Sequence, residues 1–159
     1  MRRPERWLFA PGSAEQLAAV RIGLCTILAG RLAFGPYLDL TGQPGELFRP
    51  ISFMELLPSM PPWGAVLAVQ VIGTAAAALA AVGLRTRLTL PLAWACGVFL
   101  NGMLTSTGKV VHNDVVLLLC LMPLLLAPAW DVWSLDARRR NSRRRAHESA
   151  CYGWPVRTA

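Results

Sequence analysis

Apolar and polar positions are segregated into long blocks along this chain. Four blocks are almost entirely apolar, at about residues 14–34, 63–84, 88–107 and 112–130. A helix needs about 20 consecutive apolar residues to cross the hydrocarbon core of a bilayer. We therefore predict an all-α integral membrane protein with four transmembrane helices.

The segment between the first two blocks, residues 35–62, is rich in proline and glycine. Within it, the stretch ISFMELLPSM (residues 51–60) is amphipathic but too short to span, so we expect a short interfacial helix there. Ser52 and Glu55 have the spacing of a capping box, which would begin that helix. The sequence GLRTR (residues 83–87) predicts a tight turn between the second and third spans.

Composition agrees with a membrane protein and excludes one alternative. Hydrophobic residues make up 54% of the chain, above the roughly 45–50% of soluble domains. The net charge of +7 could suggest a nucleic-acid partner, but six of the sixteen basic residues lie together at positions 138–145. Such a block beside a span is an orientation signal that also attracts anionic lipid, so we expect the lipid bilayer and no nucleic acid as partner.

The arginine distribution predicts the topology. If the N-terminus is cytoplasmic, the basic residues at positions 2, 3, 6, 85, 87, 138–145 and 157 lie inside. Of the basic residues in the connectors, only Arg49 and Lys109 lie outside, in agreement with the positive-inside rule. We predict a four-span membrane domain at residues 1–135, a basic cytoplasmic tail at residues 136–159, and both termini in the cytoplasm of a bacterial cell.

Polar residues within the predicted spans are candidates for packing or function. Arg21 lies well inside the first span, where a charge is either functional or extends toward the head groups. Arg31, near the outer end of that span, is expected at the interface. For Gln70, Thr74 and Asn101 we expect hydrogen bonds between helices.

The four cysteines indicate neither a metal site nor a redox motif. Three of them, Cys25, Cys96 and Cys120, lie inside apolar runs, where a thiol behaves as a small apolar group. No pair forms a C-x-x-C motif, so we expect no metal site and no disulfide framework.

Lys109 and His112 are the candidate catalytic residues. They stand three positions apart, on one face if the fourth helix extends that far, and they would lie at its outer end. Histidine is the usual proton carrier near neutral pH, and a lysine in a partly dry site loses its proton more readily. The alternative is that this polar segment only caps the helix, and the residues alone favour the cap.

Five pieces of the chain resemble a known family, the HTTM (horizontally transferred transmembrane) domain, which is related to vitamin K-dependent gamma-carboxylase. The pieces are FAPGSAEQLAAVRIGL, GLRTRL, GKVVHND, WSLDARR and YGWPVR. The family's carboxylase uses a reduced quinone to remove a glutamate proton. The resemblance makes His112 similar to a histidine beside that chemistry and implies a quinone, vitamin K or menaquinone, as cofactor.

The resemblance also implies a limit on activity. Lys109 is not at the position of the family's catalytic lysine, which belongs to a span after the WPVR segment, and the chain stops at Ala159. We therefore expect an N-terminal, truncated member without independent catalysis. A second hypothesis is a self-sufficient DoxX-like four-helix protein that acts as a quinone-associated subunit or assembly partner. Its partner would be another membrane protein or a second copy of the chain.

Overall fold

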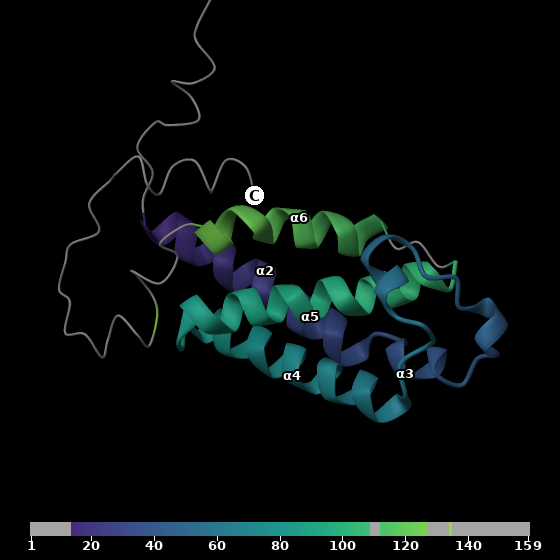
Figure 1. The fold of residues 1–159 in the computed structure, drawn as a ribbon. Coiled ribbons are helices and arrows are strands. Elements are labelled where there is room, and N and C mark those ends of the chain that lie inside the picture. The colour runs from purple at the N-terminus through teal and green to yellow at the C-terminus, as the bar shows by residue number, and fades with distance from the viewer. Residues whose placement is uncertain (1–13, 109–111, 127–133, 135–159) are drawn as a thin grey trace, which may run out of the picture.

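The computed structural model describes residues 14–108, 112–126 and 134, and their secondary structure is entirely helical. Figure 1 shows four long helices that run side by side, with short helical turns gathered at one end. In chain order the elements are α2 (Ala14–Phe34), α3 (Tyr37–Leu40), η1 (Gly45–Leu47), η2 (Ser52–Leu56), α4 (Trp63–Val82), α5 (Thr86–Ser106) and α6 (His112–Leu126).

Three of the long helices are long and apolar enough to cross a membrane: α2, α4 and α5. The prediction of an all-α membrane protein is therefore confirmed at this level. α6 is apolar but has only 15 described residues, and positions 127–130 of the predicted fourth span lie outside the described part of the chain.

The long helices form a closed bundle. α4 packs along both α2 and α5, while α6 lies against α5 and α2 and completes the group. Large apolar side chains point outward on all four helices, for example Ile27, Ile72, Leu88 and Leu119. Such an outward-facing apolar surface is what a bilayer requires, because lipid tails are as apolar as leucine.

Small residues bring the helices close together. A Cβ atom at Gly73 of α4 would lie only 2.7 Å from the Cβ of Cys96 in α5 and 3.2 Å from Cδ1 of Leu32 in α2. A Cβ at Gly97 of α5 would lie 2.9 Å from Cδ2 of Leu118 in α6. Glycine at these positions lets backbones approach closely, the usual device of helix packing in membranes.

The predicted turn between the second and third spans is confirmed, with shifted boundaries. Gly83 has a φ of 79°, and the Leu84 N–H donates to the Leu79 carbonyl, which ends α4 at Val82. This left-handed glycine cap ends the helix two residues before the predicted end. α5 begins at Thr86, two residues earlier than predicted, so Gly83, Leu84 and Arg85 make the whole connection.

The predicted interfacial segment is a short 3-10 helix, η2, and the predicted capping box at its start is wrong. The N-cap residue is Ile51, no side chain caps it, and Ser52 has a φ of 61°. A capping serine must hold an extended backbone at the N-cap, which Ser52 does not. The segment is instead anchored by Met54, which is fully buried, and by its contact with α5 at Gly102, where an added Cβ would lie 2.7 Å from Cε of Met54.

Replacing Gly73 by alanine tests the close packing of α4. We expect Gly73→Ala to lower the free energy of unfolding in detergent by about 1–3 kcal/mol, because the new methyl group overlaps the backbone-proximal atoms of Cys96. Thermal unfolding followed by circular dichroism gives the measurement. Gly23→Ala in α2 is the matched control, since nothing lies within 4 Å of that Cβ and alanine there removes only a helix-weakening glycine. Equal stability of the two variants would contradict the packing.

Candidate functional site

Of the two catalytic residues predicted from the sequence, the structure describes only the backbone of His112. Lys109 lies outside the described residues. His112 begins α6, but the position of its side chain also lies outside what the structure describes. The roles of Lys109 and His112 therefore stay predictions.

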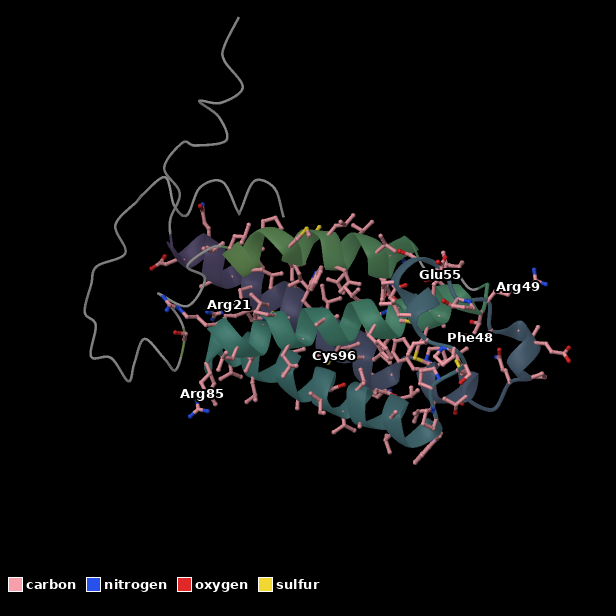
Figure 2. All side chains as sticks on the ribbon, in the orientation of Figure 1. Arg21, Phe48, Arg49, Glu55, Arg85 and Cys96 are labelled. Carbon is pink, nitrogen blue, oxygen red and sulfur yellow. The ribbon has the colours of Figure 1, made fainter. Side chains whose placement is uncertain are left out.

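Arg21 lies inside the protein, at the end of the bundle that carries the α4–α5 turn (Figure 2). Its side chain is 0% exposed, although a Cβ at Gly83 would lie 3.2 Å from its Nη2 atom. That same Cβ would collide with the buried Ser134. Arg21 therefore reaches toward the end of the bundle, as an arginine extending from a span does, but protein rather than solvent surrounds it.

At the opposite end of the bundle, Arg31 of α2 and Asp114 of α6 form a salt bridge. The Arg31 Nε donates to Asp114 Oδ1 at 2.7 Å, and Nη2 donates to Oδ2 at 2.8 Å. The Asp114 side chain is 8% exposed and that of Arg31 is 45% exposed. This two-pronged geometry is the strongest form of arginine–carboxylate pairing, and it ties the first helix of the bundle to the last.

From the sequence we expected Arg31 at the interface and did not predict its partner. The signal was nevertheless present. The predicted alternation of spans puts the end of the first and the start of the fourth on the same side of the membrane, where Arg31 and Asp114 both lie.

Tyr37 of α3 lines the same site as Arg31 and Asp114. The chain leaves α2 at Gly35, where a Cβ would collide with the Tyr37 ring and come within 2.8 Å of the Arg31 carbonyl oxygen. This tight exit folds Tyr37 back until it is only 3% exposed. Burial raises the pKa of the Tyr37 phenol, and the Asp114 carboxylate raises that pKa further, so the phenol is neutral at physiological pH.

Asn101 of α5 faces the same region and is 6% exposed. Its Oδ1 lies 3.4 Å from the Thr105 hydroxyl, but its Nδ2 has no hydrogen-bond partner. The predicted hydrogen bond from Asn101 to another helix is therefore wrong. The same prediction is wrong for Thr74, which donates to Gln70 of its own helix, and right for Gln70, whose Nε2 donates to the Leu32 carbonyl of α2 at 2.9 Å.

These groups surround a cavity of about 10 Å³, room for about one water-sized group. Its polar lining is Arg31, Tyr37, Asn101 and Asp114, and the remaining wall consists of Leu28, Leu32, Gly97, Leu117 and Leu118. The Trp94 indole donates to the Leu118 carbonyl at 2.9 Å and holds α6 against α5 beside this wall.

No family model, curated protein or solved structure matches the chain. The chemistry of the site must therefore be argued from its own residues. The salt bridge neutralises both charges, and Asn101 Nδ2 offers an unused donor. Among the described residues, no group of histidine, cysteine or acidic side chains could hold a metal ion, and Cys25, Cys96 and Cys120 are free thiols.

Removing Arg31 tests the salt bridge. Arg31→Met leaves the buried Asp114 carboxylate without its partner, and we expect a loss of about 2–3 kcal/mol in the free energy of unfolding. This is less than the 3–5 kcal/mol of a fully buried pair, because the Arg31 side chain is 45% exposed. The double variant Arg31→Met/Asp114→Leu should recover most of the loss. If the double variant is as unstable as the sum of the two single variants, the pair does not couple the helices.

Proposed function

We propose that this chain is a multi-pass protein of the bacterial cell membrane, similar to the HTTM class, that associates with a quinone and does not catalyse carboxylation by itself. The observation that carries the proposal is the meeting of three resembling segments. Arg21 comes from the first segment, Gly83 from GLRTRL and Ser134 from WSLDARR, and they gather at one end of the bundle. The proximity of Gly83 to Arg21 and Ser134 gives a structural reason why the three segments occur together in one sequence.

The distribution of charge supports a cytoplasmic location of that end. Arg85 and Arg87 are exposed beside the α4–α5 turn. The opposite end carries Arg49 together with the exposed acidic residues Asp39, Glu46 and Glu55, and Figure 2 shows Arg49 and Glu55 far from Arg85. Because basic residues favour the cytoplasmic side, we place the α4–α5 turn in the cytoplasm. If α6 is a fourth span, both termini also lie in the cytoplasm.

The outer end is where we place the quinone. His112 begins α6 two residues before Asp114, so the candidate histidine belongs to the same end as Arg31, Tyr37 and Asn101. The exposed apolar faces of α2 and α6 would let a membrane-dissolved molecule approach from the bilayer. A binding role rather than a catalytic one is proposed because Lys109 does not match the family's catalytic lysine.

One observation favours the second hypothesis, a DoxX-like four-helix subunit or assembly partner. The four long helices close on one another, with α6 fastened to α2 by Arg31–Asp114 and to α5 by the Trp94 hydrogen bond. A closed bundle can be stable alone and present its outer surface to a second membrane protein.

Reduced quinone, oxygen, bicarbonate and a glutamyl peptide supplied to the purified chain should give no carboxylated product under either hypothesis.

The topology can be tested with reporters. A fluorescent protein fused after Arg145 should fluoresce in the cytoplasm of a bacterial host, and alkaline phosphatase inserted near Gly45 should be active outside it. The physical reason is that arginine-rich segments are retained on the cytoplasmic side during insertion. A fluorescent protein that stays dark after Arg145, together with an inactive phosphatase near Gly45, would reverse the orientation.

Quinone association can be measured on the full chain in lipid nanodiscs. A short-chain menaquinone analogue should quench tryptophan fluorescence saturably, and His112→Ala should weaken this binding about tenfold, the effect of losing one good hydrogen bond. His147→Ala in the basic tail is the matched control and should bind as the unaltered chain does. Equal affinity in the His112 and His147 variants would assign His112 to helix capping alone, and the absence of saturable quenching would refute quinone association.

A further inference from the structure

Asn101, which lines the cavity at the outer end, has a hydrogen-bond donor without an acceptor. Asn101 is only 6% exposed, and its Nδ2 atom has no hydrogen-bond partner. Buried polar groups in proteins are nearly always paired, and leaving one unpaired costs about 1–3 kcal/mol. A bound oxygen acceptor in the cavity that Asn101 lines would remove this cost.

The charge of the cavity restricts what can bind. Both oxygens of Asp114 accept hydrogen bonds from Arg31, so the two charges neutralise each other. The pair therefore gives the cavity no net charge that would attract an anion or a cation. Charged groups are also costly within the membrane. The occupant is therefore neutral.

The size and walls of the cavity restrict the occupant further. About 10 Å³ admits a single oxygen-sized group and excludes a ring. Leu28, Leu32, Leu117 and Leu118 form most of the walls. A buried water needs two to four polar partners, and because Arg31 and Asp114 bond to each other, only Asn101 and Tyr37 are left to supply them. A carbonyl oxygen needs only one donor, and the apolar remainder of its molecule can lie along the outer surface of the helices.

The cavity lies near the outer end of the helices, within reach of molecules in the bilayer. Arg31 lies three residues before the end of α2 and Asn101 five residues before the end of α5, about 5–8 Å inside the helix ends at 1.5 Å per residue. The half-exposed Arg31 side chain marks where the cavity reaches the surface. A 21-residue helix is about as long as the hydrocarbon core is thick, so this depth lies just inside the boundary between hydrocarbon and head groups.

We propose that the cavity between α2, α5 and α6 binds the carbonyl oxygen of a neutral or zwitterionic membrane amphiphile, with Asn101 Nδ2 as the hydrogen-bond donor. Two sources share this chemistry: the ester carbonyl of a phospholipid and the ring carbonyl of a quinone at the entrance. The quinone source rests on the proposed function, and the phospholipid source does not.

Solid-state NMR of the full chain in nanodiscs tests the site. The protein carries ¹⁵N in its asparagine side chains, and ¹³C is placed in one sample at the ester carbonyls of phosphatidylcholine and in another at the carbonyls of a menaquinone analogue. We expect a ¹⁵N–¹³C contact between Asn101 and one of these carbonyls. The contact should disappear in Asn101→Leu and persist in Thr74→Val, which alters a span residue that bonds only to its own helix.

Assignment does not depend on the folding of Asn101→Leu. The variant Asn113→Asp/Asn141→Asp leaves Asn101 as the only labelled asparagine, so its contact can be identified directly. A phospholipid contact alone supports the carbonyl site and counts against a quinone there, whereas a quinone contact supports both proposals. A contact only with water protons, or none with either carbonyl, would overturn the inference.

Discussion

The salt bridge between Arg31 and Asp114 constrains its end of the bundle more than any other interaction described. In the part of the chain that the structure describes, α6 is the shortest of the four long helices, and it carries a proline, Pro123, that cannot donate a backbone hydrogen bond. Its attachment to the bundle therefore depends on specific contacts. Arg31 supplies one at the start of α6, and Trp94 supplies another through the Leu118 carbonyl. These two contacts hold α6 against the helices that supply the other residues of the polar cavity.

The two ends of the bundle use arginine differently. Arg21 is wholly enclosed at the end that carries the α4–α5 turn, and Gly83 leaves the space in which its guanidinium lies. Arg31 is half-exposed and faces a buried carboxylate. A charge within a membrane protein is affordable only when partners or water compensate it. The first helix can therefore carry two arginines because the surrounding chain encloses one and neutralises the other.

Much of the fold could be predicted because hydropathy is a local property. The bounds of α2 follow directly from the apolar run between Ser13 and Gly35. Side-chain pairing was harder, because it depends on how each helix is rotated about its axis. Gln70 was assigned an interhelical hydrogen bond correctly, while Thr74 and Asn101 were not, although all three are polar residues in similar apolar surroundings. Spacing alone also failed at Ser52, whose left-handed backbone prevents it from acting as a cap.

The candidate site combines features that sequence reasoning treats separately. A histidine at a helix start suggests proton transfer, but the described geometry beside His112 is a neutral pair, a neutral phenol and one amide donor. Burial keeps the Tyr37 phenol protonated, and both carboxylate oxygens of Asp114 are engaged by Arg31. These groups can orient a neutral molecule by hydrogen bonding. A site with this chemistry is suited to holding a carbonyl in place, so any proton transfer at this end of the bundle would have to come from Lys109, from His112 or from a partner protein.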